Sequence, residues 1–290
     1  MQKKVVITTD SSSDLPPAIR KEFCVYEIPL HVSLGEAQKG MDCVDIFPND
    51  LYRAYHEQGV YPKTAAPSYG EYETFFRRFI EQGCAVVHIS LNSAFSSCFS
   101  VAQMVARELD GEIHVVDSLL FCTAAGMLCV QAAKLRDEGL CAGEIARRLA
   151  SLKGRVKAYF FIDKLDVIAK GGRVPAFVAM GANLLNIHPS VTADGNTGKL
   201  GIGKKYRNKT LLAQQAWIED TMSAMRGLVD SSLVFFMHTP EMPAEIYERH
   251  NRLAQSLLPG VERWVLDTVG CMILAHCGFN CLAAIGIEKM

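Results

Sequence analysis

The chain lacks long hydrophobic runs, and their absence argues against several classes of protein. No window of about 18 apolar residues occurs among the 290 residues, so the sequence predicts no membrane span. The first ten residues, MQKKVVITTD, contain no long apolar stretch of the signal-peptide kind and lead directly into a predicted strand. The formal net charge is only −1, which gives no electrostatic reason to expect nucleic acid or an anionic membrane surface as a partner.

Cysteine is plentiful, but it lacks the spacing of the common metal and redox motifs. None of the ten cysteines forms a CxxC pair, and most lie in apolar runs, as Cys24, Cys84 and Cys129 do. Cys277 and Cys281 are four residues apart, which is weak spacing for a zinc site. We therefore expect reduced and mostly buried cysteines, no metal, and a cytoplasmic location.

The stretch 84–102 carries the clearest functional signal. The apolar run CAVVHIS fits a buried strand, and the apolar residues from Phe99 onward have helical spacing. Between strand and helix lies a turn with four serines, Ser90, Ser93, Ser96 and Ser97. An anion is favoured where a strand ends and a helix begins in this way. Because the turn has no glycine and no lysine, it suits one carboxylate better than a triphosphate, or it is simply a capped helix start with spare serines.

The order of the predicted elements indicates two domains. In residues 1–155, strand-like runs alternate with helical patterns, which favours a parallel sheet of Rossmann-like type. Three of these strands end in polar turns, at residues 9–14, 90–97 and 117–118. We expect the three turns to meet at one edge of the sheet and to form a polar ligand site. Residues 156–290 favour an α+β domain with a mixed or antiparallel sheet, including a hairpin at Asp194-Gly195 and a helix over 176–185.

Two local signals predict single elements of the N-terminal domain. Ser68 and Glu71 form a capping-box pattern, which predicts a helix over 69–82. The run 24–32 alternates like one strand, and Pro29 within it indicates a position at the edge of a sheet, where a missing backbone donor is tolerated.

Seven sequence blocks occur in a fixed order along nearly the whole chain. They are TDSSSDL at 9–15, TAAPS at 64–68, LNSAFSSCF at 91–99, VDS at 116–118, LDVIAKGGRV at 165–174, NIHP at 186–189 with Asp194-Gly195 and Arg207, and GCMILAHCG at 270–278. Together they resemble the DegV (EDD) family, the bacterial fatty-acid-binding proteins. The chain departs from that family's pattern at a few positions, namely Ala65-Ala66, Ser97-Cys98, His188 and Phe279-Asn280.

The resemblance implies that one long-chain fatty acid, such as palmitate or oleate, lies between the two domains. It also implies a chain without cofactor or catalytic machinery of its own, which presents the carboxylate to a fatty acid kinase subunit for acyl-phosphate formation in phospholipid metabolism. The residues expected at the carboxylate are Thr64, Asn92, Ser93, Ser96 and His276. Those expected along the acyl tail are Phe95, Ile168, Phe177, Met180 and Leu184. Two arginines, Arg173 and Arg207, are expected near the head group or on the surface that faces the kinase.

Elementary energetics is compatible with such a site. Burial at ~0.8 kcal/mol per methylene gives a sixteen-carbon tail roughly 11 kcal/mol before the costs of association. The carboxylate then needs hydrogen bonds mainly to avoid a loss of several kcal/mol. Two other functions stay open from the sequence: a regulatory module that senses a lipid, and a self-sufficient hydrolase or phosphotransferase. The second is disfavoured because the sequence contains neither a GxSxG elbow nor a P-loop.

Overall fold

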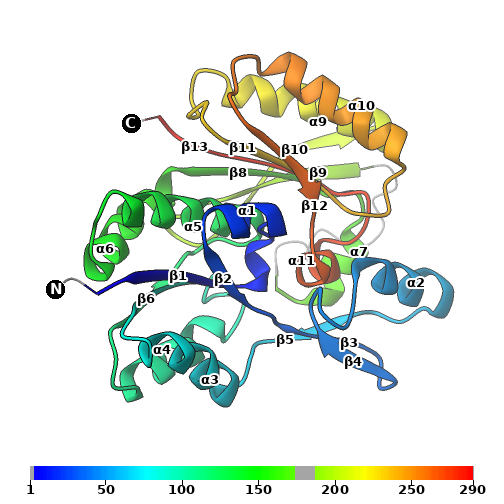
Figure 1. Ribbon diagram of the computed structural model, residues 1–290. Coiled ribbons are helices and arrows are strands. Elements are labelled where there is room, and N and C mark those ends of the chain that lie inside the picture. The colour runs from blue at the N-terminus through cyan, green and yellow to red at the C-terminus, as the bar shows by residue number, and fades with distance from the viewer. Residues whose placement is uncertain (1–2, 174–186, 290) are drawn as a thin grey trace.

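Two sheets of different kinds form the main layers of strands (Figure 1). They are seen in a computed structural model that describes residues 3–173 and 187–289. The first sheet has four parallel strands, and the second has six strands in mixed orientation, which confirms the predicted fold class. The helix expected over 176–185 lies outside the described residues.

The parallel sheet has the strand order β2-β1-β6-β7. Its strands are β1 (Val5–Asp10), β2 (Val25–Ile28), β6 (Ala85–Ser90) and β7 (Ile113–Asp117). The two central strands are buried along their whole length, as expected for parallel strands that are covered on both faces. The helices that connect and cover these strands are α1 (Pro17–Glu22), α3 (Tyr69–Ile80), α4 (Cys98–Glu108) and α6 (Ala142–Leu152). Helix α3 begins at the predicted capping box, in which Ser68 and Glu71 satisfy each other's backbone N–H groups.

The mixed sheet has the strand order β10-β9-β8-β13-β11-β12. Its strands are β8 (Val156–Phe161), β9 (Ile187–Ala193), β10 (Leu200–Arg207), β11 (Val234–His238), β12 (Trp264–Thr268) and β13 (Leu282–Ile287). Helices α9 (Thr210–Met225) and α10 (Ala244–Leu257) cover its outer face (Figure 1). Phe161 and Phe236 pack there against Trp217, whereas Phe160 and Met237 belong to the core between the two sheets.

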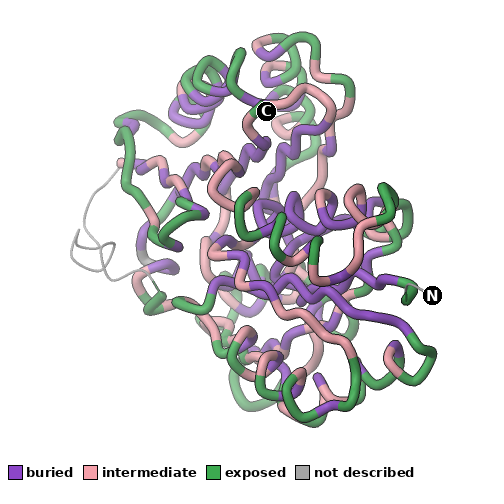
Figure 2. Tube along the Cα trace, turned by 90° about the vertical axis from the view of Figure 1, so that its left-hand side faces the viewer, coloured by how far each residue is buried: buried purple, intermediate pink, exposed green. Residues whose placement is uncertain are grey.

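Helix α5 (Cys122–Asp137) lies between the two sheets and contacts both (Figure 1). Eleven of its 16 residues are buried, and they are mostly small or apolar. A helix that is enclosed on all sides needs no polar face, and small side chains allow its neighbours to approach closely. At Gly126, for example, an added Cβ would lie 2.8 Å from the backbone oxygen of Ser13. Figure 2 shows the resulting interior, in which buried segments are surrounded by exposed loops and exposed turns of the outer helices.

A third sheet of short strands is not apparent from the sequence. The run 24–32, expected as one strand, divides at Pro29: β2 lies at the edge of the parallel sheet, as this proline indicated, and the chain then changes direction. The small antiparallel sheet consists of β3 (His31–Leu34), β4 (Gln38–Met41) and β5 (Lys63–Ala65). Three helices lie beside it, α2 (Pro48–Gln58), α7 (Leu165–Gly171) and α11 (Cys271–Cys277), and the last of these is not predicted from the sequence.

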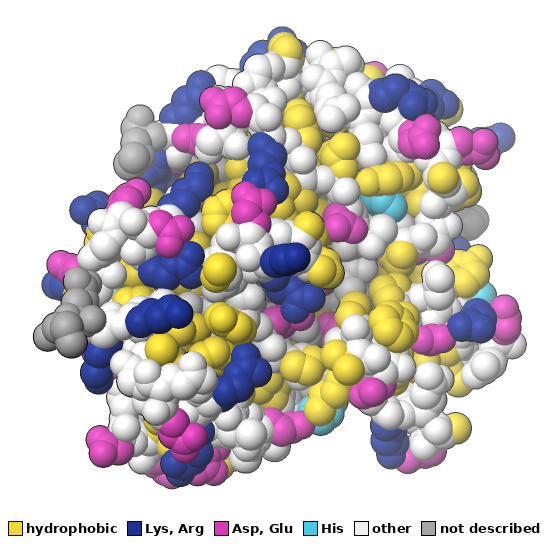
Figure 3. Space-filling model, in the orientation of Figure 1, with side chains coloured by type: hydrophobic (Ala, Val, Ile, Leu, Met, Phe, Trp, Pro, Cys, Tyr) yellow, Lys and Arg dark blue, Asp and Glu magenta, His cyan; other side chains and the backbone are white. Residues whose placement is uncertain are grey.

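The molecular surface carries charges of both signs. Figure 3 shows basic and acidic side chains interspersed over one face, with hydrophobic side chains between them. This mixture agrees with the near-zero net charge of the chain. Within residues 3–173 and 187–289, no helix combines the length and the hydrophobicity that crossing a bilayer requires.

The predicted hairpin is present between β9 and β10. The glycine with left-handed backbone in this hairpin is Gly198, whose φ is 71°, and not Gly195. A Cβ atom on Gly195 would clash with the backbone carbonyl oxygen of Lys153, in the short 3-10 helix η2 (Lys153–Arg155). The hairpin and this 3-10 helix therefore touch through backbone atoms.

We expect Gly195→Ala to lower the free energy of unfolding by about 1–3 kcal/mol, because overpacking against backbone has no easy relief. The matched control is Gly70→Ala on α3, where a Cβ meets nothing within 4 Å. This control is expected to stabilise the protein by up to about 1 kcal/mol, as alanine favours helix. Urea denaturation measures both effects, and equal stabilities of the two variants would contradict the close backbone contact.

Candidate functional site

A cavity of about 660 Å³ lies between the mixed sheet and the loops at the carboxyl ends of the parallel strands. Its walls come from both halves of the chain: β5 and the β6–α4 loop on one side, and β8, α7, β11, α11 and β13 on the other. The size is typical of sites that enclose a small organic molecule. The lining is largely apolar, with polar groups confined to a few positions.

Three aromatic rings form a continuous wall of the cavity. The rings of Phe121 and Phe160 stack with centroids 4.8 Å apart, and Phe95 meets Phe121 edge-on at 6.0 Å. They come from the β6–α4 loop, the residue before α5, and strand β8, so the wall spans the space between the two sheets. Further apolar lining side chains include Ile162, Ile168, Val191, Met237, Met272 and Ile273.

Of the residues expected along the tail, Phe95 and Ile168 line this cavity. The remaining three, Phe177, Met180 and Leu184, lie outside the described residues. The aromatic wall itself is richer than the sequence suggested, since Phe121 and Phe160 are not among the expected residues.

One polar group of the lining is a threonine–histidine pair. The Oγ1 atom of Thr64 lies 2.8 Å from Nε2 of His276. The other ring nitrogen, Nδ1, is buried without a hydrogen-bond partner among the residues that the structure describes, and a Cβ on Gly171 would lie 3.0 Å from it. Burial, and secondarily the positive charge of Arg173, lowers the pKa of His276 to about 4. The imidazole is therefore neutral at pH 7, and Arg173, which also lines the cavity, supplies the positive charge there.

A second polar group is the serine-rich turn after β6. Ser93, Ser96 and Ser97 all line the cavity, and Ser93 is exposed. The Oγ atom of Ser96 accepts a hydrogen bond of 3.2 Å from the N–H of Cys98, so this serine satisfies the backbone N–H of the first residue of α4. Burial raises the pKa of Cys98 to about 12, which leaves an inert thiol rather than a nucleophilic thiolate at this turn.

Two expected site residues lie elsewhere. Asn92 is fully buried and outside the described lining of the cavity. Its side-chain amide donates to the carbonyl oxygens of Leu119 (3.0 Å) and Gly198 (2.9 Å), and its Oδ1 accepts from the N–H of Ala94 (2.9 Å). Asn92 thus fixes the serine turn and joins it to the β9–β10 hairpin. Arg207 is exposed at the end of β10 and is also not among the described lining residues.

The other two polar strand ends are not among the described lining residues of the cavity, so the expectation that all three turns form one ligand site is wrong. The serines after β1 form a buried 3-10 helix, η1 (Ser11–Ser13). Asp10 accepts hydrogen bonds from the N–H of Leu91 (2.9 Å) and from Ser90 (3.2 Å). Asp117 at the end of β7 accepts one from the N–H of Ser93 (3.2 Å). Both carboxylates hold the backbone of the serine turn in place through these hydrogen bonds and do not line the cavity.

All ten cysteines carry free thiols, as expected, but they are not uniformly buried. Cys24, expected inside, is exposed, and so is Cys43. Both have a left-handed backbone, with φ of 49° and 55°. Such a conformation occurs at tight turns, which lie on the surface, and this explains the exposure.

Fold and cavity together define an α/β protein with an enclosed, mainly apolar ligand site. A family model described as the DegV family of uncharacterised proteins matches residues 4–289, and the chain belongs to that family. A DegV domain-containing protein of Clostridium acetobutylicum is 26% identical over 288 residues, which cover 99% of each chain.

Solved structures with the same fold include proteins described as fatty-acid binding. A Thermotoga maritima protein, reported to reveal a fatty acid binding function, is 25% identical with a TM-score of 0.78, covering 98% of this chain and 99% of that one. A stearic-acid-binding protein of Eubacterium ventriosum is 23% identical with a TM-score of 0.83, covering 98% of each chain.

Proposed function

We propose that this chain binds one long-chain fatty acid, such as palmitate or oleate, in the cavity between the two sheets. The observation that carries the proposal is a single cavity that combines an aromatic and aliphatic wall with hydroxyl groups and a neutral histidine. The fatty acid binding reported for the Thermotoga relative supports the same ligand class. Residues 1–155 and 156–290 are proposed to act as two domains that enclose the ligand.

The acyl tail supplies most of the affinity in this proposal. Its methylenes lie against Phe95, Phe121 and Phe160 and the aliphatic side chains beyond them. At ~0.8 kcal/mol per methylene, sixteen carbons contribute roughly 11 kcal/mol, from which association and chain ordering subtract several kcal/mol. No cofactor is required for such binding.

The carboxylate is proposed to lie among Thr64, Ser93 and His276, with the backbone near Ser96 at the start of α4. A carboxylate accepts hydrogen bonds only, so the hydroxyl of Thr64 must donate to it. This requires His276 to carry its proton on Nε2, where it donates to Thr64 Oγ1 at 2.8 Å. Arg173 adds a positive charge beside these groups without closing the site, because its side chain is exposed.

We further propose that the chain is a binding subunit and not an enzyme, and that a separate fatty acid kinase phosphorylates the presented carboxylate. Two observations support the proposal that the chain binds the fatty acid and leaves the chemistry to another protein. The histidine of the site is neutral and tied to a hydroxyl, and the thiol of the turn is inert, so neither is set up as a nucleophile. The exposed Arg207 is proposed to face the kinase. The free thiols fit a cytoplasmic location.

The first test is the lipid that accompanies the purified protein. We expect organic extraction followed by mass spectrometry to find about one long-chain fatty acid per chain, because a largely apolar cavity retains its ligand through purification. Delipidated protein should then take up one equivalent of labelled palmitate. A lipid-free protein that fails to take up palmitate and oleate would overturn the proposal.

Addition of ATP and the fatty acid kinase from the same cell tests the proposal that this chain presents its fatty acid to a kinase. Acyl phosphate should form only when both proteins are present. Tight lipid binding without acyl phosphate would indicate a lipid-sensing module instead, and ATP or ester turnover by the isolated chain would indicate an enzyme.

A further inference from the structure

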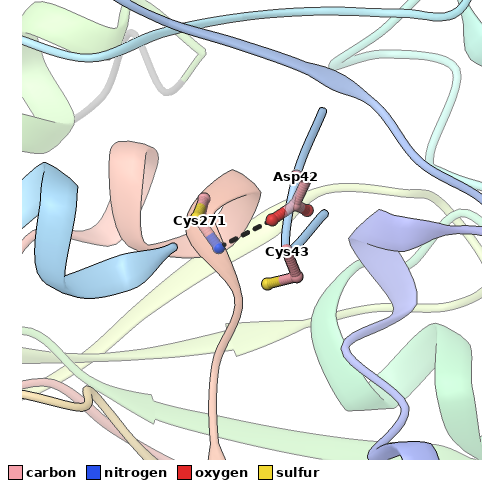
Figure 4. Close-up of side chains that lie close together, drawn as sticks. All are labelled: Asp42, Cys43 and Cys271. Atoms are coloured by element: carbon pink, nitrogen blue, oxygen red, sulfur yellow. Dashed lines mark hydrogen bonds between the residues drawn. The ribbon is translucent and has the colours of Figure 1, made fainter. Parts of the chain in front are cut away.

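A group of metal-ligating side chains that the lipid site does not use lies where α11 meets the loop after β4 (Figure 4). It consists of Asp42, Cys43 and Cys271, and one ligand atom from each lies within 4.8 Å of the other two. Asp42 and Cys43 belong to the loop between β4 and α2, and Cys271 is the first residue of α11. The fold therefore brings together ligand types from distant parts of the sequence.

The carboxylate of Asp42 is buried and held in one orientation. Its Oδ1 accepts a hydrogen bond of 2.9 Å from the N–H of Cys271 (Figure 4), and its Oδ2 accepts one of 2.8 Å from Ser11. Each carboxylate oxygen keeps a second lone pair, so these bonds do not exclude a metal ion. In metal sites, hydrogen bonds of this kind orient the carboxylate ligands toward the metal ion.

A second buried acid adjoins the group. Asp14 is only 8% exposed, and its Oδ1 accepts a hydrogen bond of 2.9 Å from the N–H of Gly270, whereas its Oδ2 has no partner among the described residues. A Cβ on Gly270 would lie 3.1 to 3.4 Å from Asp14 Oδ1, Cys43 Sγ and Asp42 Oδ1, so these atoms converge on one point. Two buried carboxyl groups side by side favour a cation.

One backbone oxygen holds the main chain of Cys43 and the thiol of Cys271 together. The carbonyl of Ile46 accepts the N–H of Cys43 at 2.9 Å and the thiol of Cys271 at 3.1 Å. Cys271 is fully buried, whereas Cys43 is exposed and gives access from solvent. Sulfur ligands select thiophilic metals such as zinc over magnesium or calcium.

We propose that Asp42, Cys43 and Cys271 bind a thiophilic divalent cation of the Zn²⁺ type. Binding forms two metal–sulfur bonds and one metal–oxygen bond, and both thiol protons pass to solvent. Tetrahedral coordination leaves a fourth position for water or Asp14. Because Met272, Ile273 and His276 on α11 line the lipid cavity, the cation would attach one cavity wall to the loop after β4.

Titration of the full-length, reduced and EDTA-treated protein with Co²⁺ and then Zn²⁺ tests the site. We expect one equivalent of Co²⁺ to produce a thiolate-to-cobalt charge-transfer band, Zn²⁺ to abolish it, and about two protons to be released. Cys43→Gly should eliminate the band and weaken Zn²⁺ binding at least about 100-fold. Glycine suits the left-handed backbone of Cys43, so this variant should fold normally.

The matched control is Cys24→Gly, since Cys24 is also an exposed cysteine with left-handed φ. It should bind metal as the parent protein does. Absence of the band in the parent protein, or equal titrations for Cys43→Gly and the control, would overturn the proposal. So would a reduced protein that takes up no metal but forms a Cys43–Cys271 disulfide with hydrogen peroxide. Metal uptake is measured without lipid, so this test is independent of the proposed function.

Discussion

Replacing Ala283 by phenylalanine is expected to weaken fatty acid binding more than about 100-fold while the protein stays folded. Ala283 on β13 is paired with Phe160 on β8 and with Met237 on β11, and all three line the cavity. Directly paired residues point to the same face of a sheet. A phenyl group at position 283 would therefore project among these side chains into the space assigned to the acyl tail, and it would fill a hollow rather than overpack a core.

The expected size of the effect follows from the excluded tail. If the ring displaces about four methylenes, the loss is about 3 kcal/mol at ~0.8 kcal/mol each. Since about 1.4 kcal/mol corresponds to a tenfold change, the Kd for palmitate should rise more than about 100-fold. Displacement of a fluorescent fatty acid measures this change, and thermal unfolding verifies the fold.

The same substitution at an exposed position controls for added hydrophobicity. Ala244→Phe at the start of α10 lies away from the cavity and should leave the Kd for palmitate unchanged. Normal binding by a folded Ala283→Phe protein would mean that the acyl tail lies elsewhere.

Much of the fold could be predicted because its signals are local. The alternation of strands and helices indicated the parallel sheet, and the Ser68–Glu71 capping box located the start of α3. The serine turn after β6 is recognisable from its hydroxyl groups between a strand and a helix, and three of its serines line the cavity. These signals depend on residues that are close in the sequence, and such residues stay close in the folded structure.

The part of the cavity wall that the mixed sheet supplies could not be predicted, because it depends on which face of a covered sheet a residue occupies. Phe160 lines the cavity, and the adjacent Phe161 packs on the opposite face against α9. Both residues are apolar and buried, so no polar side chain at this end of β8 distinguishes the two faces. Helix α11 could not be predicted from the sequence for a similar reason. Its first five residues, Cys271 to Ala275, are all buried, so the segment has no amphipathic period. The contact of Cys43 with Cys271 is purely tertiary.

Removing the two hydroxyl groups assigned to the carboxylate is expected to weaken the binding of a fatty acid but not of a fatty alcohol. Thr64→Val keeps the β-branched shape in β5, and Ser93→Ala changes an exposed turn, so the double variant should fold normally. A hydrogen bond to a charged group contributes about 1.5–3 kcal/mol, and two of them about 3 kcal/mol or more. The Kd for palmitate should therefore rise about 100-fold or more.

The comparison ligand separates the head group from the tail. Hexadecanol carries the same sixteen carbons but no charge, and a neutral hydroxyl tolerates the loss of hydrogen-bonding partners at a smaller cost. Its affinity should change by less than about a factor of ten, because the tail contacts with Phe95, Phe121 and Phe160 are retained. An equal loss for both ligands would show that Thr64 and Ser93 act on the shape of the cavity. In that case the carboxylate must lie at another part of the lining, and the orientation of the ligand in the cavity would be reversed.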